Sequence, residues 1–211
     1  MSLADPSTTT RWWWVRHAPV RVNDGRIYGQ YDHPCDCTND ALFAALAREL
    51  PTDAVWVTST LLRTIQTADA LRAAGAVGPE PLREPAFMEQ SFGDWQGVKY
   101  ADLPALRGEA VHRFWLAPAH EAPPGGESFV ALIDRVSAAI DRLTTLHRGR
   151  DIVAVTHGGT IRAAIAHALQ LPPETALAFS VENVSLTRLD HVDGPGLGHG
   201  WRVEVVNRMA A

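Results

Sequence analysis

Apolar runs of strand length alternate along this chain with segments of helical periodicity. The clearest runs are rich in β-branched and aromatic residues, and they are Arg11–Val15, Ala54–Thr58 and Asp151–Thr156. Continuous apolar runs of this kind are typical of parallel strands that are buried on both faces. Their alternation with helices is typical of an α/β sheet. We therefore predict a three-layer α/β/α sandwich with a mostly parallel central sheet.

Capping and breaking residues bound the predicted helices. A helix that Thr38, Asn39 or Asp40 can cap should end near Leu50, before Pro51. Three further helices, each closed by glycine or proline, are predicted over Leu61–Ala74, Ser128–His147 and Gly159–Leu171. Near the end of the chain, Val184–Leu189 and Arg202–Val206 alternate and predict a hairpin.

The segment 93–126 breaks this alternation, because it mixes aromatic and basic residues with four prolines. We predict that it is a cap-like insertion over one edge of the sheet. The whole chain of 211 residues has the length of one domain, and we assign 1–211 to a single domain with this insertion.

Charge and cysteine content exclude several classes of protein. The formal net charge of −5 argues against a nucleic-acid binder, which usually carries a basic patch. The two cysteines, Cys35 and Cys37, are too close for a disulfide scaffold, so we expect a reducing compartment. No apolar run approaches the roughly 20 residues that span a bilayer, and Met1–Thr10 has no signal-peptide pattern. We expect a frayed N-terminus, a cytoplasmic protein and no membrane partner.

Polar motifs follow the three predicted strands. Arg16-His17 follows the first, Ser59–Arg63 the second and Thr156–Gly159 the third. Parallel strands end at the same edge of a sheet, which is where α/β proteins bind ligands. Helix N-termini add N–H donors and favour anions there, and guanidinium groups match phosphate oxygens. The two arginines and two histidines therefore predict a phosphate pocket.

A neutral imidazole in such a pocket can attack phosphorus and form a phosphohistidine. His17, held among cations, should have a depressed pKa and stay neutral. Glu89, in Glu89–Gly93, is the candidate acid for the leaving oxygen. The sequence has no Walker loop and no acidic metal cluster, so we expect arginines to neutralise the charge, with no metal and no cofactor.

Four motifs, taken in order, give a family resemblance. Val15–Pro19 resembles the Arg-His-Gly signature of the histidine phosphatase (phosphoglycerate mutase-like) superfamily, and Ser59–Ala68, Glu89–Gly97 and Thr156–Arg162 resemble its later motifs. The resemblance implies a phosphohistidine at His17 and acid–base catalysis by Glu89. It also implies phosphate contacts from Arg16, Arg63 and His157, and no metal.

The resemblance adds Asn23, Gly29 and Gly158 as phosphate- or substrate-binding residues. Asn23 could equally form a turn. This sequence departs from the family's first motif at two places near the predicted pocket. Ala18-Pro19 replaces the usual glycine and its polar neighbour, and Val20 stands where relatives often carry a side chain with a hydroxyl group.

Phe114-Trp115 and Pro123–Ser128 most resemble the α-ribazole phosphatase branch. We therefore expect a phosphatase for a small phosphorylated metabolite, with α-ribazole 5′-phosphate as the specific prediction. The alternatives are a phosphoglycerate mutase-type phosphoryl transferase and a non-catalytic module that binds a phosphate ligand. A homodimer formed at a sheet edge would leave no mark in the sequence.

Several other residues have competing interpretations. Glu84 is a weaker candidate acid than Glu89, and Glu127 is expected to cap the helix that begins at Ser128. Aromatic and basic residues of the insertion could contact the organic part of the substrate or form its own small core; these are Trp95, Lys99, Tyr100, Arg113 and Trp115. His33, Cys35 and Cys37 are too few for a structural zinc site.

Overall fold

The computed structural model describes residues 7–108 and 112–211. Within them, a six-stranded sheet has the order β3-β2-β4-β1-β5-β6. The strands are β1 (Thr8–Arg16), β2 (Ala54–Thr58), β3 (Leu82–Arg83), β4 (Asp151–Thr156), β5 (Leu186–Asp193) and β6 (Trp201–Arg208). The first four pair in parallel, whereas β5 is antiparallel to both β1 and β6. The prediction of a mostly parallel sheet is confirmed.

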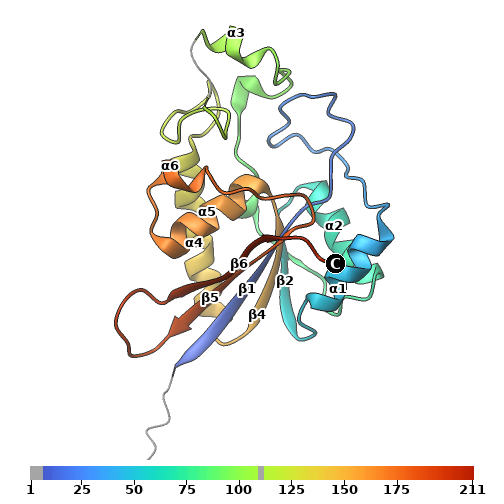
Figure 1. Ribbon diagram of the computed structural model, residues 1–211, viewed down its shortest axis with the longest axis vertical. Helices are drawn as coiled ribbons and strands as arrows, with labels where there is room; N and C mark the ends of the chain where they lie inside the picture. Colours follow the sequence, from blue (N-terminus) through green and yellow to red (C-terminus); the bar gives the residue numbers. More distant parts are fainter. Residues whose placement is uncertain (1–6, 109–111) are drawn as a thin grey trace, which may run out of the picture.

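Helices cover both faces of the sheet (Figure 1). On one face lie α1 (Asp40–Glu49) and α2 (Leu62–Ala73), and on the other lie α4 (Phe129–Leu146), α5 (Gly158–Leu169) and the short α6 (Pro173–Ala176). Each face has its own apolar core, one around Trp56 and Phe43, the other around Trp12 and Leu132. This is the predicted three-layer α/β/α arrangement.

The predicted capping residues lie at the starts and ends of the helices. Asn39 accepts a hydrogen bond from the Leu42 amide at 3.1 Å, and Ser128 accepts one from the Ala131 amide at 3.1 Å. Gly75 follows α2 with a φ of 107°, a left-handed conformation that glycine adopts at little cost.

The tryptophans of β1 fix the centre of the sheet. Trp12 and Trp14 stack at 4.8 Å between ring centroids, and Phe87 of the short helix η1 (Pro85–Phe87) packs edge-on against both. Trp13 points to the other face, where its Nε1 donates to Asp151 Oδ1 at 2.8 Å. With β4 and β5 as neighbours, β1 is an interior strand packed on both faces. Its C-terminal end is therefore held firmly.

Parts of segment 93–126 lie above the carboxyl edge of the sheet (Figure 1). They include η2 (Gly93–Trp95) and α3 (Leu103–Arg107). Here Trp95, Leu103 and Ala117 form a separate apolar cluster with Ile27 and Phe92. That the segment is a cap-like insertion in a single domain stays our prediction, and its residues 109–111 lie outside the described ranges.

Short elements and the chain start differ from the sequence-based expectations. The prediction of a frayed Met1–Thr10 is wrong for Thr8–Thr10, because they pair with β5 and extend β1; residues 1–6 lie outside the described ranges. The strand β3 and the helices η1, α3 and α6 were not predicted, since two to five residues are too few to show a period. No helix in the described ranges has the length and apolar character needed to cross a membrane.

Candidate active site

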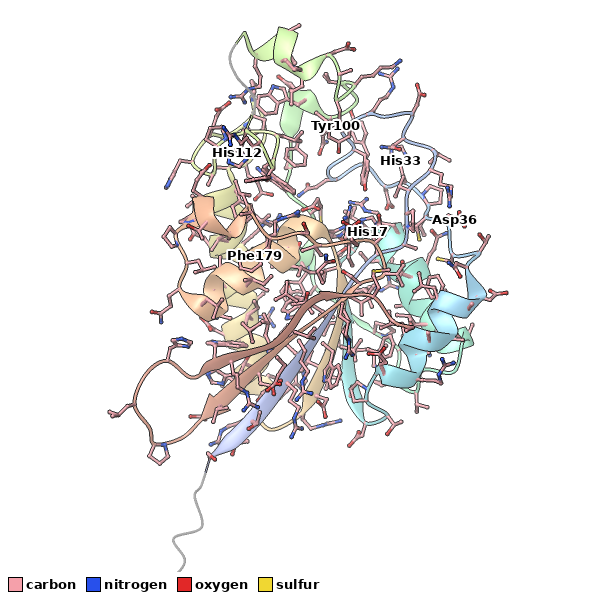
Figure 2. All side chains as sticks on the ribbon, viewed as in Figure 1. His17, His33, Asp36, Tyr100, His112 and Phe179 are labelled. Atoms are coloured by element: carbon pink, nitrogen blue, oxygen red, sulfur yellow. The ribbon has the colours of Figure 1, made fainter. Side chains whose placement is uncertain are left out.

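The parallel strands bring three of the predicted motifs to one edge of the sheet. Arg16 is in register with Thr156, so His17 and His157 follow neighbouring strands. The His17 amide donates to the Thr156 carbonyl oxygen at 2.9 Å, and the two imidazole rings lie 5.2 Å apart. Figure 2 shows His17 at the upper end of the sheet, with Tyr100 on the segment above it.

The His17 imidazole has a defined tautomer. Its Nδ1 lies 2.7 Å from the Ala18 carbonyl oxygen, which can only accept a hydrogen bond. Nδ1 therefore carries the proton, and Nε2 holds the free lone pair. Burial lowers the pKa of His17 well below 6.5, and the nearby Arg63 and Arg16 lower it further. The ring is thus a neutral imidazole with an unprotonated Nε2.

Arg63, in the first turn of α2, is fully buried and fixed by three acceptors. Its Nη1 and Nη2 donate to the carbonyl oxygens of Tyr31 at 2.8 Å and Gly29 at 2.6 Å. Its Nε donates to His157 Nδ1 at 3.3 Å. The loop that carries the Gly29 carbonyl group also packs against Phe92, and only glycine fits there. A Cβ at residue 29 would lie 2.9 Å from Phe92 Cδ2, and the φ of +43° is one that other residues rarely adopt.

His157 lies between the end of β4 and the start of α5 and is also buried. Since its Nδ1 accepts from Arg63, its Nε2 carries the proton and donates to Ser59 Oγ at 2.8 Å. Burial lowers the pKa of His157 well below 6.5, as do Arg63, His17 and Arg16. Both histidines at this edge are therefore neutral near pH 7.

Arg16 presents an unsatisfied donor. Its Nη1 donates to the Val181 carbonyl oxygen at 2.5 Å, but its buried Nε has no hydrogen-bond partner within residues 7–108 and 112–211. A buried donor without a partner costs about 1–3 kcal/mol. The Nε lies beside Gly158, the first residue of α5, where the helix adds amide donors and positive dipole. This corner favours an anion.

The Glu89 carboxylate lies at the same helix terminus. Its Oε1 accepts from the Gln90 amide at 2.9 Å, and its Oε2 accepts from the Gly159 amide at 3.2 Å. The alternative acid, Glu84, instead caps η1 by accepting from the Ala86 amide at 3.0 Å and pairs with Arg142. Of the two carboxylates, Glu89 is the one that lines the cavity described below.

An ion pair holds the backbone that carries Glu89. Arg135 of α4 donates to the carbonyl oxygens of Met88 at 2.9 Å and Glu89 at 3.0 Å, and it forms a bidentate pair with Glu127 at 2.7 and 3.0 Å. Glu127 also accepts from the Ser91 amide at 2.9 Å. The prediction that Glu127 caps the following helix is wrong, because Ser128 performs that function and leaves Glu127 free to pair.

A cavity of about 350 Å³ opens at this edge. Four predicted site residues line it, namely Arg16, Gly29, Glu89 and Gly158. His17, Arg63 and His157 are buried and are not among the lining residues. Asn23 does not line it either: its Nδ2 donates to the Arg26 carbonyl oxygen at 3.0 Å and closes a turn, so its phosphate contact stays a prediction.

Segment 93–126, the predicted cap, contributes several residues to the wall of the cavity. Of the insertion residues with two interpretations, Tyr100, Arg113 and Trp115 line the cavity, whereas Trp95 is buried in the cap's apolar cluster. Lys99 is not a lining residue; it pairs with Arg26 through the backbone. Sequence reasoning missed Arg162 as a lining residue. The sequence feature that could have identified Arg162 is its position in the Thr156–Arg162 motif. It lies one helical turn after Gly158 and therefore on the same face of the helix.

The Cys35 and Cys37 sulfur atoms lie 3.5 Å apart against α2, and Cys35 Sγ also contacts the Arg63 carbonyl oxygen at 3.2 Å. Within residues 7–108 and 112–211, no group of three or more His, Cys, Asp or Glu side chains is arranged to hold a metal ion.

Comparisons with known proteins agree with this geometry. The family model described as "Histidine phosphatase superfamily (branch 1)" matches residues 12–207. A "Probable phosphoglycerate mutase GpmB" from Serratia proteamaculans is 29% identical over 193 residues, which cover 90% of this chain and 89% of that protein.

Two solved structures have the same fold. "Mycobacterial hydrolase 2" matches with a TM-score of 0.82 and 28% identity over 97% of this chain and 93% of that chain. A mycobacterial glucosyl-3-phosphoglycerate phosphatase matches with a TM-score of 0.78 and 28% identity over 94% of this chain and 99% of that chain.

Proposed function

The chain belongs to the histidine phosphatase superfamily, and we propose that within it the protein hydrolyses phosphomonoesters through a phosphohistidine at His17. One observation carries the proposal. The buried imidazole donates from Nδ1 to a carbonyl oxygen and keeps Nε2 unprotonated, beside two arginines that can hold a phosphoryl group. Such an imidazole is a nucleophile at neutral pH.

In the first half-reaction, the Nε2 lone pair of His17 attacks phosphorus and the ester P–O bond breaks. Arg16 and Arg63 neutralise the charge on the phosphoryl oxygens, with the unpaired Arg16 Nε as one donor. The His157 imidazole contributes to the same pocket. In the tautomer described above, its Nδ1 accepts from Arg63 Nε and so orients that guanidinium, and a direct contact between His157 and the phosphoryl group stays a prediction.

Glu89 supplies and then removes a proton. As the ester bond breaks, the protonated carboxyl group donates to the leaving oxygen. The carboxylate then takes a proton from a water molecule, whose oxygen attacks phosphorus while the P–N bond breaks and its electron pair returns to His17. The products are an alcohol and inorganic phosphate. No step in this sequence requires a metal or a cofactor, because the arginines supply the positive charge.

Two observations favour hydrolysis over phosphoryl transfer. A mutase has to keep water away from the phosphoenzyme, but here two lining residues of the described segments, Tyr100 and Phe114, are exposed to 49% and 60%. The relative described as a phosphoglycerate mutase keeps transfer as the second candidate, while the two solved structures are described as a hydrolase and a phosphatase.

The cavity suits a small phosphorylated metabolite. A volume of about 350 Å³ lies at the lower end of the range for small-molecule pockets. The finer prediction, α-ribazole 5′-phosphate, depends on the resemblance in Pro123–Ser128. This compound therefore belongs in the first substrate panel.

The nucleophile is tested with p-nitrophenyl phosphate in EDTA, comparing the wild type with His17→Ala. We expect turnover in the wild type and none in the variant, together with an acid-labile, base-stable phosphoenzyme in the wild type alone. Equal turnover in both proteins would refute His17 as the nucleophile. No turnover in either would favour the transferase or the binding module.

The acid is tested with Glu89→Gln. Turnover of an alkyl phosphate, whose leaving group needs a proton, should fall by roughly 10²–10⁴-fold. Turnover of p-nitrophenyl phosphate should fall far less, because p-nitrophenolate leaves with little protonation. Equal losses on the two substrates would argue against Glu89 as the acid.

A further inference from the structure

We infer that the substrate carries a second anionic group, a carboxylate or another phosphate, and that Arg162 binds it. The inference rests on the proposed function, because the first anion is the phosphoryl group held next to His17. It assigns a specificity-determining residue to the outer part of the cavity.

Arg162 is oriented by the protein and keeps donors free. Its Nε donates to the Phe179 carbonyl oxygen at 2.8 Å, and its guanidinium carbon lies 4.8 Å from the centre of the Trp115 ring. Figure 2 shows Phe179 beside α5, the helix that carries Arg162. Within residues 7–108 and 112–211, neither Nη group has a hydrogen-bond partner and no carboxylate pairs with the side chain. A fixed guanidinium with two free Nη groups on a cavity wall is a preorganised site for an anion.

The electrostatic surroundings of Arg162 also lack compensation. Burial lowers its pKa to about 10, which means that the charged form is disfavoured relative to water. Glu89, and less strongly Glu182, raise the pKa again. Both Glu89 oxygens accept backbone amides, and among the described residues neither carboxylate forms an ion pair with Arg162. An anionic ligand group would offset the burial of the guanidinium.

Arg162 lies close to Arg16, one of the two arginines proposed to hold the phosphoryl group. A Cβ on Gly158 would lie 3.1 Å from Arg162 Nη1 and 3.5 Å from Arg16 Nε. The two guanidinium groups therefore flank Gly158, and a ligand needs only a short spacer to contact both.

The charge on the cavity wall agrees with a ligand of two anions. Among residues 7–108 and 112–211, the charged lining residues are Arg16, Arg113, Arg162 and Glu89, so three cations face one carboxylate there. If the Arg16 and Arg63 charges match one phosphoryl dianion, Glu89 can offset only one of the two remaining lining cations. Aromatic side chains around Trp115 would contact the spacer between the anions.

Two phosphonates of equal chain length test the inference without turnover. The first, 3-phosphonopropionate, carries a phosphonate and a carboxylate, and the second, propylphosphonate, carries the phosphonate alone. Calorimetric titration of the wild type should give roughly 10- to 100-fold tighter binding of 3-phosphonopropionate, which is the range for a charge-assisted contact. Methylenediphosphonate, titrated in parallel, distinguishes a second phosphate from a carboxylate.

In Arg162→Gln, the ratio of the two phosphonate affinities should fall to about one, and in Arg162→Lys it should lie between the two values. Arg48→Gln is the matched control, since Arg48 is an exposed cation on α1 that does not line the cavity, and its loss should change the ratio by less than about threefold. Thermal denaturation identifies any variant that has lost its fold, and Arg162→Lys covers the case in which Arg162→Gln does not fold.

Two results would overturn the inference. One is equal weakening of both phosphonates in Arg162→Gln, which would place Arg162 at the phosphoryl group itself. The other is a ratio near one in the wild type, which would favour a substrate whose only anionic group is its phosphate, such as α-ribazole 5′-phosphate. Because phosphonates are not hydrolysed, these outcomes stay separate from a failure of the proposed reaction, which the His17→Ala comparison detects.

Discussion

Replacing Gly159 with alanine should damage catalysis strongly while leaving the protein folded. Gly159 is the second residue of α5, and a Cβ there would overlap Glu89 Oε1 and lie 3.1 Å from Leu132 Cδ2. The carboxylate is at the end of a flexible side chain, whereas Leu132 is fully buried in the core. The group that moves is therefore Glu89, which must rotate away from the α5 terminus.

The expected change in stability is the balance of two terms. Alanine in a helix is favoured over glycine by roughly 0.5–1 kcal/mol. Displacing Glu89 loses its charge-assisted hydrogen bond from the Gly159 amide, a contact of about 1.5–3 kcal/mol. The net loss in the free energy of unfolding is then about 0.5–2.5 kcal/mol, small enough for the variant to stay folded at 25 °C.

The loss of turnover should be much larger than the loss of stability. If Glu89 leaves its position, the general-acid contribution of about 10²–10⁴-fold is reduced or lost for an alkyl phosphate. Steady-state kinetics on an alkyl phosphate and on p-nitrophenyl phosphate, combined with urea denaturation, measure both effects. Gly196→Ala is the control, because a Cβ there meets nothing within 4 Å. Alkyl phosphate turnover within a few-fold of the wild type, in a variant of normal stability, would refute the placement of Glu89.

Three further predictions follow from the site. Burial lowers the pKa of His17 and His157 below 6.5, so the unfolded chain binds more protons than the native one as the pH falls. The free energy of unfolding should therefore decrease below about pH 6.5, by up to about 1.4 kcal/mol per pH unit for each histidine. Urea denaturation at several pH values measures this decrease. A value that stays constant down to about pH 5.5 would contradict the burial of neutral rings. Gly29→Ala should cost about 2 kcal/mol or more in urea denaturation, and more than Gly25→Ala, because both have positive φ but only Gly29 has close neighbours. Removing metal ions with EDTA should leave p-nitrophenyl phosphate turnover unchanged, and a loss that zinc reverses would rule out the metal-free scheme.

The sequence predicted the long elements and the meeting of the catalytic motifs for identifiable reasons. Strands β2 and β4 have the predicted bounds, because each is a continuous apolar run between polar residues. The parallel order then requires the ends of β1, β2 and β4 to share an edge, which is why the sequence alone groups His17, Arg63 and His157.

Features that depend on tertiary contacts could not be predicted in the same way. The orientation of Arg162 into the cavity follows from Trp115 and Phe179, which are distant in the sequence. The pairing of Glu127 with Arg135 requires both the α4 terminus and the Glu89 segment to be in place. Asn23 illustrates the remaining ambiguity, because the same amide can close a turn or bind an anion.

The aromatic stack of β1 has a consequence for how new specificities could arise. Trp12 and Trp14 anchor Phe87, two residues before Glu89, and the same strand ends at Arg16, immediately before His17. The nucleophile and the acid are thus both attached to the packed core of the sheet, while much of the outer cavity wall belongs to segment 93–126, which we predict to be a cap-like module. Exchanging that module between relatives would alter which molecules enter without disturbing bond cleavage. A chimaera with a foreign cap should keep its turnover of p-nitrophenyl phosphate and acquire the substrate preference of the donor.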